Sequence, residues 1–367
     1  IASKIFIKFC LECLEKSRLS CHDPKLLIIN TNTFVEWRGY MNKRDLSCLN
    51  IAVILPAYNE ELTITETIES FFKQLPEASF YIVNNNSKDQ TAEIAEKTLE
   101  TLGAKGKVIH EMKQGKGNAV RKAFTSIDAD IYVMSDADMT YPAEQVHALI
   151  EPVIDGSADM AVGDRLSAGH YQNENKRSFH GFGNNLVRWL INKLFRANLK
   201  DIMTGYRAFN RKFVKNYPIL VEGFEIETDL TLHALDKRFS IVEIDIEYID
   251  RPAGSVSKLN TFADGTKVLF TIAKIFRYYR PMMFFGTISA GFFLLGLLAA
   301  YPVFVDWFTH QYIYHIPLAV LAAGLEISAI MALGVGLILD SIAHQNKMTF
   351  ERSILSDTLS LSHTRER

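Results

Sequence analysis

Two carboxylates separated by one residue, Asp136 and Asp138, come just after the apolar run at residues 131–134, with only Ser135 between. Such a run is typical of a buried strand, and ligands of open α/β sheets bind beyond the carboxyl ends of the strands. Mg²⁺ and Mn²⁺ prefer oxygen ligands, commonly one or two carboxylates together with substrate phosphate oxygens. The pair therefore predicts a Mg²⁺ or Mn²⁺ site beside a phosphate site. A loop that caps a helix is an equally good interpretation of the spacing alone.

Polar clusters follow two earlier apolar runs in the same way. The clusters at 56–60 and 84–89 come after apolar runs at 51–55 and 80–83, and helical patterns at 61–74 and 91–102 lie between the runs. Fully apolar strands that alternate with helices are typical of a mainly parallel sheet covered on both faces. We expect an α/β domain of Rossmann type, with the polar clusters gathered at one edge of its sheet.

The composition excludes several classes of protein. The 367 residues include 40 Lys and Arg against 42 Asp and Glu, so the net charge of −2 excludes a polybasic nucleic-acid binder. With 48% hydrophobic and 22% charged residues the chain is expected to fold. All four cysteines precede residue 49, which predicts a body without disulfides. Cys10, Cys13 and Cys21 with His22 form only half of a paired zinc pattern, so residues 1–49 are expected to be a poorly ordered extension. This segment also shows no signal-peptide pattern, and Met41 is a candidate start.

The C-terminal part predicts a membrane region. Residues 282–305 and 316–339 are apolar stretches of 24 residues each, and each would extend about 36 Å as a helix, enough to cross a bilayer. A basic amphipathic segment at 259–281 precedes them and is expected to lie in the membrane interface. Lys and Arg flank the pair but are missing from the loop between the stretches, so the positive-inside rule predicts a cytoplasmic domain and a cytoplasmic tail at 341–367.

Glu326 is the one ionisable residue inside the second stretch. Because an unpaired charge facing lipid is unfavourable, we expect Glu326 to face another helix. A functional role at a ligand path within the membrane and a role as a contact between helices are both open. A pair of thin spans beside a large domain also favours a homo-oligomer.

Seven motifs occur in an order that resembles the family 2 glycosyltransferases. They are Pro-Ala-Tyr-Asn-Glu at 56–60, Asn-Asn-Asn-Ser-Lys-Asp-Gln-Thr at 84–91, Gly-Lys-Gly-Asn-Ala at 115–119, Asp-Ala-Asp-Met-Thr-Tyr-Pro at 136–142, Gly-Asp-Arg at 163–165, Asp-Ile-Met-Thr-Gly-Tyr-Arg at 201–207 and Arg-Pro-Ala-Gly-Ser-Val-Ser-Lys at 251–258. The set is similar to the polyprenyl-phosphate branch, such as dolichol-phosphate mannose synthases and bacterial undecaprenyl-phosphate glucosyltransferases. The resemblance implies a GT-A domain at 50–258, followed by the interfacial segment and two spans at 282–340.

The resemblance also implies roles for individual residues. The nucleotide-sugar is implied to be bound by Pro56, Tyr58, Glu60, Asn84, Asp89, Lys116 and Asp136, and the metal by Asp136, Asp138 and Thr140. The residues implied to be catalytic are Asp136, Asp138, Arg165, Arg207 and Glu227. The acceptor phosphate is implied to be bound by Arg207, Arg251, Ser257 and Lys258. Thr140 stands where relatives often have Gln. Arg165 and Lys258 are alternatively surface charges.

The implied reaction is metal-dependent, inverting transfer of one sugar from a UDP- or GDP-sugar to a polyprenyl phosphate at the cytoplasmic membrane face. A phosphate acceptor is ionised near neutral pH and needs no strong base. A hydroxyl acceptor would need one, and Glu225, Glu227 or Asp229 are the candidates; Glu227 is alternatively an ion-pair partner of an Arg. A processive polysaccharide synthase would need more spans and an intact Gln-x-x-Arg-Trp motif.

One departure from the family pattern concerns the nucleotide. Many relatives carry Asp-Asp-Gly where this chain has Asn at 84–86, so neutral amides are expected to contact the base or ribose. The same departure is the only support for a non-catalytic scaffold that binds a nucleotide-sugar or lipid carrier, and the intact Asp136 and Asp138 pair argues against that alternative.

Overall fold

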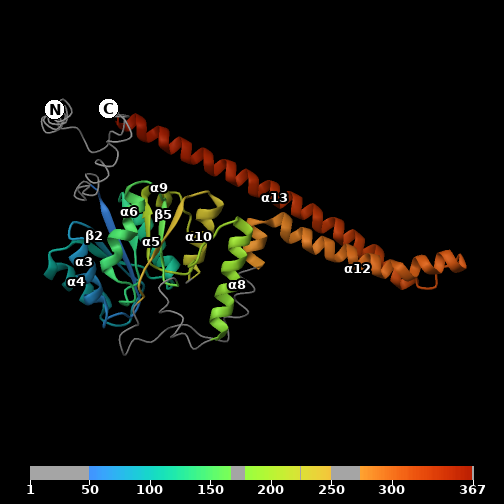
Figure 1. The fold of residues 1–367 in the computed structure, drawn as a ribbon, viewed down its shortest axis with the longest axis horizontal. Coiled ribbons are helices and arrows are strands. Elements are labelled where there is room, and N and C mark those ends of the chain that lie inside the picture. Colours follow the sequence, from blue (N-terminus) through green and yellow to red (C-terminus); the bar gives the residue numbers. More distant parts are fainter. Residues whose placement is uncertain (1–48, 167–177, 224, 249–272, 366–367) are drawn as a thin grey trace, which may run out of the picture.

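The computed structural model describes residues 49–166, 178–223, 225–248 and 273–365. Predictions for residues 1–48, for most of 259–281, and for Arg251, Ser257 and Lys258 lie outside these residues. Within them, a sheet with helices on both faces forms a domain from which two long helices project (Figure 1).

Within the described ranges, seven strands form one sheet. In chain order they are β1 (Ile51–Ala57), β2 (Ser79–Asn84), β3 (Lys105–His110), β4 (Ile131–Met134), β5 (Met160–Asp164), β6 (Arg207–Asn210) and β7 (Ile241–Asp245). Their order in the sheet is β3-β2-β1-β4-β6-β5-β7, and β6 runs antiparallel to β4 and β5 while the other pairs are parallel. The predicted mainly parallel α/β sheet is confirmed.

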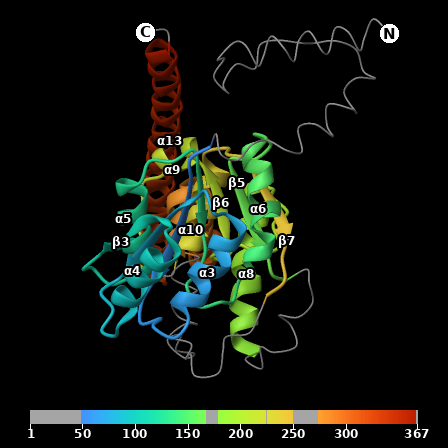
Figure 2. The same cartoon turned by 90° about the vertical axis from the view of Figure 1, so that its left-hand side faces the viewer.

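Helices cover both faces of the sheet (Figure 2). Successive side chains of a strand point to opposite faces, so Val53 and Leu55 of β1 join one apolar cluster while Ala52 and Ile54 join the other. The first cluster includes residues of α3 (Ile64–Gln74), α4 (Thr91–Leu102) and α6 (Val146–Ile154), and the second includes residues of α5 (Lys116–Ser126), α9 (Arg211–Lys215) and α10 (Ile226–Asp236). The helix predicted at 91–102 coincides with α4, whereas α3 begins three residues later than predicted.

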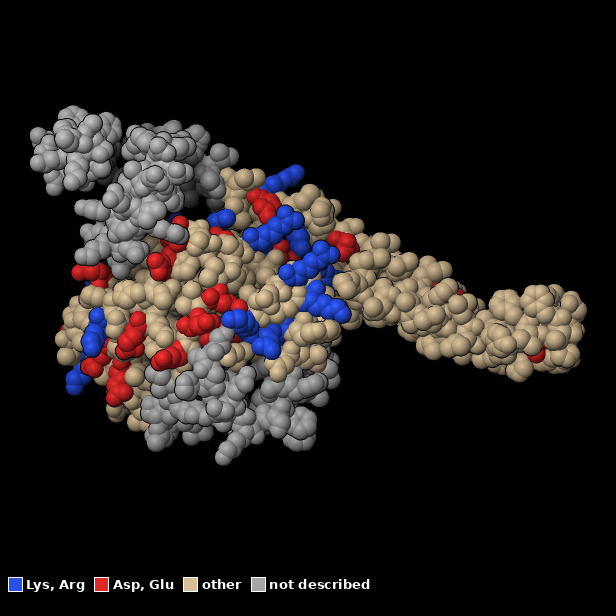
Figure 3. All heavy atoms as spheres, in the orientation of Figure 1, with Lys and Arg blue, Asp and Glu red and all other residues tan. Residues whose placement is uncertain are grey.

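A smaller apolar cluster joins the domain to the projecting helices. Residues 273–279 are helical, and Ile275, Phe276 and Tyr279 pack with α8 (Ser178–Phe195). Nη2 of Arg280 donates to the carbonyl of Leu194 at 3.1 Å, which fixes the end of α8 to the start of the helix pair. Lys and Arg side chains gather on the surface in this region (Figure 3).

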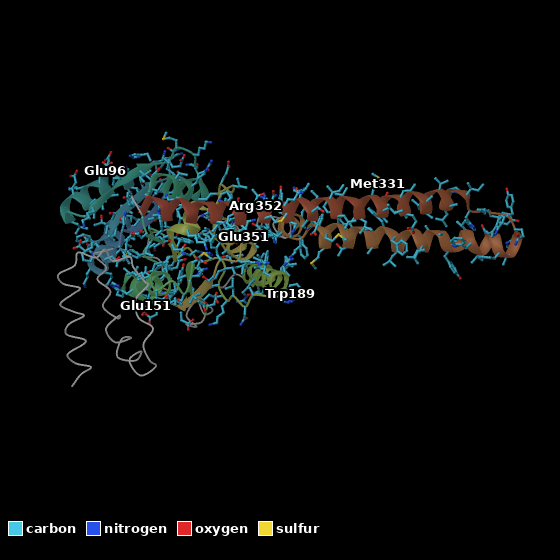
Figure 4. The ribbon with its side chains drawn as sticks, turned by 90° about the horizontal axis from the view of Figure 1, so that it is seen from above. Glu96, Glu151, Trp189, Met331, Glu351 and Arg352 are labelled. Atoms are coloured by element: carbon cyan, nitrogen blue, oxygen red, sulfur yellow. The ribbon has the colours of Figure 1, made fainter. Side chains whose placement is uncertain are left out.

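The projecting pair consists of α12 (Pro281–His310) and α13 (Ile316–Arg365). Both helices are long and apolar enough to cross a membrane and are mostly exposed, as Met331 of α13 illustrates (Figure 4). The helices approach closely at Gly296, where an added Cβ would lie 2.5 Å from Oε1 of Glu326. Glu326 therefore faces the neighbouring helix, as predicted.

Residues 341–365, the described part of the tail predicted at 341–367, continue α13 back along the domain (Figure 1). Phe350 and Ile354 pack against the cluster formed by α5, α9 and α10. Nζ of Lys347 lies 2.5 Å from Oδ1 of Asp236, the last residue of α10. The end of α13 and the domain therefore lie on the same side of the apolar pair.

Candidate active site

The polar clusters of the sequence meet at the carboxyl edge of neighbouring strands β2, β1 and β4. The loops after β1 and β2 are joined by backbone-to-side-chain hydrogen bonds: Asn59 N donates to Ser87 Oγ at 3.1 Å, and Lys88 N donates to Asn59 Oδ1 at 2.8 Å. This edge is where a parallel sheet binds ligands. The structure thus brings together clusters that are up to about 80 residues apart in sequence.

The loop after β4 holds two carboxylates in different environments. Asp138 is buried, 3% exposed, and its Oδ1 accepts hydrogen bonds from the backbone N and the hydroxyl of Thr140 at 3.2 and 2.5 Å. The Asp136 side chain is 27% exposed. The hydroxyl of Thr63 anchors the residue between them by donating to the carbonyl of Ala137 at 2.8 Å. Thr140, predicted as a metal ligand, thus orients the Asp138 carboxylate.

Lys116 lies between two carboxylates from distant parts of the chain. Its Nζ contacts Oδ1 of Asp136 and lies 2.6 Å from Oε1 of Glu227, in the first turn of α10. Lys116 and Glu227 side chains are each only 9% exposed. Burial alone would lower the pKa of Lys116, but the two carboxylates outweigh it and raise that pKa well above its ordinary value. The ammonium is therefore a permanent charge of the site.

Glycines allow the backbone to approach this ion-paired group. A Cβ on Gly205 would lie 2.8 Å from Nζ of Lys116 and 2.9 Å from both carboxylate oxygens of Asp136. A Cβ on Gly117 would lie 2.2 Å from the carbonyl oxygen of Val221, in the segment that leads to α10. At Gly117 the obstacle is backbone, so only glycine fits, whereas at Gly205 the obstacle is the charged ends of two side chains that a Cβ would displace.

Five of the seven predicted nucleotide-sugar-binding residues lie at or just beyond the ends of β1 and β2. Pro56 lies within β1, and the Tyr58 hydroxyl accepts a hydrogen bond from Gln114 Nε2 at 3.1 Å. Glu60 N donates to the Thr91 hydroxyl at 2.9 Å, and Asp89 accepts from the backbone N and hydroxyl of the same Thr91. Part of their work is therefore to hold the two loops in place.

Two of the three consecutive asparagines are engaged inside the protein. Asn84 Oδ1 accepts from Ser87 N at 3.0 Å, and its amide lies 3.3 Å from His110 Nδ1. Asn85 accepts from Gly115 N at 2.7 Å and donates to the carbonyl of Lys113 at 2.6 Å. Asn85 thus braces the residues just before Lys116 and α5, a role the sequence did not reveal, since only the tertiary contact identifies its partners.

Arg165 forms a two-pronged ion pair with Asp201. Its Nε and Nη2 donate to Asp201 Oδ2 and Oδ1 at 2.7 and 3.1 Å, and its guanidinium lies 5.5 Å from the ring centre of Tyr248. Tyr141 connects this pair to the site: its hydroxyl accepts from Gly205 N at 2.9 Å and lies 3.5 Å from Nη1 of Arg165. The alternative of an isolated surface charge does not describe Arg165.

Arg207 is placed differently from the prediction. Its side chain is fully buried, and it donates to the carbonyls of Thr204 and Ile202 and to the hydroxyl of Thr231, at 2.9, 2.8 and 2.9 Å. Burial lowers the pKa of Arg207 to about 10, so the group stays charged at neutral pH. Because β6 inserts between β4 and β5, Arg207 lies in the sheet opposite Met134 and Val162. We therefore describe Arg207 as a core brace beneath α10 and do not retain it as a phosphate ligand.

The acidic pair suits a divalent cation. Asp136 and Asp138 offer hard carboxylate oxygens on one loop, and such a pair fits Mg²⁺ or Mn²⁺ when the remaining ligands are phosphate and water oxygens. Among the residues described, no group of three or more His, Cys, Asp or Glu is arranged to hold a metal on its own.

The two remaining candidate bases lie in other surroundings than Glu227. Asp229 accepts a hydrogen bond from the Tyr217 hydroxyl at 2.7 Å, and Glu225 is the residue just before α10.

The chain is similar to known proteins in sequence and in fold. The family model for Glycosyl transferase family 2 matches residues 52–217. The dolichyl-phosphate hexose transferase of Haloferax volcanii is 30% identical over 62% of this chain and 93% of its own length. The polyprenol monophosphomannose synthase of Mycolicibacterium smegmatis is 28% identical over 57% of this chain and 80% of its own. Among solved structures, glucosyl-3-phosphoglycerate synthase from Mycobacterium tuberculosis with Mn²⁺, UDP and phosphoglyceric acid aligns with a TM-score of 0.48 and 20% identity, over 63% of this chain and 78% of that one.

Proposed function

This chain belongs to glycosyl transferase family 2 and is a glycosyltransferase with an α/β domain, and from that premise we propose its acceptor and mechanism. It transfers one sugar from a nucleotide diphosphate-sugar to a polyprenyl phosphate, with Mg²⁺ or Mn²⁺ and with inversion at the anomeric carbon. Relatives named for polyprenol and dolichyl phosphate support this acceptor class.

One structural observation carries the proposal. The Asp136 and Asp138 loop, with Lys116 and Glu227 beside it, lies on a domain joined directly to two helices apolar enough to span a membrane. A polar donor that carries a diphosphate requires the charged group, and an acceptor with a polyprenyl chain requires access to a bilayer. Both requirements are met within one chain.

The residues present suggest how the charges are managed. An acceptor phosphate oxygen forms a bond to the anomeric carbon while the bond from that carbon to the diphosphate breaks, and the electron pair leaves with the nucleotide diphosphate. Asp136 and Asp138 would hold the cation, whose positive charge offsets the charge that develops on the departing diphosphate. Lys116 supplies a further fixed positive charge. Because Glu227 is ion-paired with Lys116, it serves to position that ammonium and is poorly suited to act as a base.

We also propose how the chain is oriented relative to the membrane. The end of α13 packs against the domain, so both lie on one side of the apolar pair. Lys274, Arg277 and Lys347 flank the pair on that side, and the connecting loop carries no Lys or Arg. The positive-inside rule then places the domain and the end of α13 in the cytoplasm.

The test is sugar transfer by the purified full chain in detergent. Radiolabelled UDP- and GDP-sugars are offered with undecaprenyl phosphate and Mg²⁺ or Mn²⁺, and label in the organic phase is counted. We expect transfer from one donor class, lost with EDTA and with Asp138→Ala. The matched control is Glu96→Ala, which removes an exposed carboxylate of α4 at the end of the domain opposite the projecting helices (Figure 4). Donor binding without transfer to any polyprenyl phosphate would refute the proposed acceptor.

A further inference from the structure

Resting on the proposed function, we propose that Lys116 is a built-in counter-ion that holds Asp136 before the donor arrives, so that the divalent cation and the nucleotide diphosphate bind as an interdependent pair. In the donor-free protein the ammonium neutralises the carboxylate that the cation needs. When the diphosphate enters, it takes over the ammonium and leaves Asp136 to the cation. Lys116 thereby couples two binding events at one site.

The first support is the geometry of the ion pairs. Nζ of Lys116 contacts Asp136 and lies 2.6 Å from Glu227, with its side chain 9% exposed. A cation that binds Asp136 alone must compete with this ammonium at close range. The Asp138 carboxylate already accepts two hydrogen bonds from Thr140. Binding of the cation without a nucleotide is therefore disfavoured.

The second support is the way the protein holds Lys116 in place. Lys116 is the first residue of α5, so its backbone is fixed by the helix, and Asn85 braces the preceding residue through Gly115 N. The backbone at Gly205 lies against one side of the ammonium, so close that a Cβ added to this glycine would be 2.8 Å from Nζ. Glu227 remains a partner of the ammonium when Asp136 turns to the cation. The ammonium therefore stays in the site at both stages.

This arrangement makes a thermodynamic prediction. If nucleotide diphosphate relieves the competition at Asp136, it must raise the affinity for the cation, and the cation must raise the affinity for the nucleotide by the same factor. Removal of the ammonium should raise the affinity for the cation alone and reduce the coupling. A residue that only binds phosphate would lower nucleotide affinity and leave binding of the cation alone unchanged.

The experiment measures Mn²⁺ binding to the full chain in detergent by electron paramagnetic resonance, first alone and then with UDP or GDP. For Lys116→Met we expect Mn²⁺ alone to bind roughly tenfold more tightly than in the wild type, the effect of losing one close charge pair, and nucleotide to add less to its affinity. Lys122→Met, an exposed lysine of the same helix, controls for net charge and should change neither value.

Glu227→Gln provides an independent test if Lys116→Met does not fold. This variant leaves the ammonium to Asp136 alone, so Mn²⁺ without nucleotide should bind more weakly than in the wild type. Unchanged or weaker Mn²⁺ binding in a folded Lys116→Met variant would overturn the proposal. Since no acceptor is present, failure of sugar transfer to polyprenyl phosphate would count against the proposed function and leave this result intact.

Discussion

Replacement of Arg207 distinguishes a core brace from a phosphate ligand. In the structure its guanidinium is fully buried and donates to three acceptors at 2.8–2.9 Å. Arg207→Met keeps much of the apolar volume but leaves two carbonyls and the Thr231 hydroxyl without their donor. Arg207→Lys keeps the charge and can restore only part of this set, because an ammonium lacks the guanidinium's planar fork.

The expected loss follows from those three hydrogen bonds. A buried acceptor left without its donor costs about 1–3 kcal/mol, and removal of the buried charge recovers part of the total, so Arg207→Met should lose about 3–5 kcal/mol. For a domain of about 200 residues, 1 kcal/mol changes the Tm by about 2–4 °C, so we expect a decrease of roughly 10 °C. Arg207→Lys should show about half of it.

The assay is thermal unfolding in detergent, paired with the KM for undecaprenyl phosphate. Arg211→Met is the matched control, because Arg211 is a 41% exposed arginine whose ion pair with Asp128 contributes little. A Tm for Arg207→Met within about 2 °C of the wild type, combined with a large rise in KM, would contradict the brace and restore the phosphate role.

Three further outcomes test other parts of the structure. His233 is buried beside Lys237, and burial lowers its pKa to about 4, from a value near 6.5 in the unfolded chain. Between these two pH values the unfolded chain binds a proton that the folded chain does not, so the free energy of unfolding should fall by about 3 kcal/mol as the pH drops from 6.5 to 4. Unfolding of His233→Phe should lack this pH dependence. Phe350→Ala should weaken docking of α13 by about 1–2 kcal/mol and speed limited proteolysis of the helix end, while Glu351→Ala, one residue on and exposed, should not. Gly205→Ala should lower kcat/KM at least about tenfold with little change in Tm, because the new Cβ displaces only the flexible ends of Lys116 and Asp136; a normal kcat/KM would refute this steric argument.

Local patterns in the sequence were sufficient for much of the fold. Strand and helix periodicity depends on neighbouring residues, so α4 and the strands that carry the active-site loops could be predicted from it. The position of Asp136 and Asp138 after an apolar run likewise placed them at the carboxyl edge of the sheet. The length and apolarity of α12 and α13 indicated a membrane region in the same way.

Burial and pairing were decided by the tertiary structure, because they depend on segments far apart in the chain. Arg207 lies in the core since β6 runs antiparallel between β4 and β5, and no local pattern reports that insertion. Lys116 and Glu227 are 111 positions apart. They become partners because the start of α5 accepts contacts from the segment just before α10, where Gly117 N and Asn118 N donate to the carbonyls of Gly223 and Glu222. The helical end of α13 is mainly polar, and its contact with α10 through Phe350 becomes evident only when the two helices are placed side by side. Residue type and spacing show which groups can react, whereas the fold fixes which of them face one another.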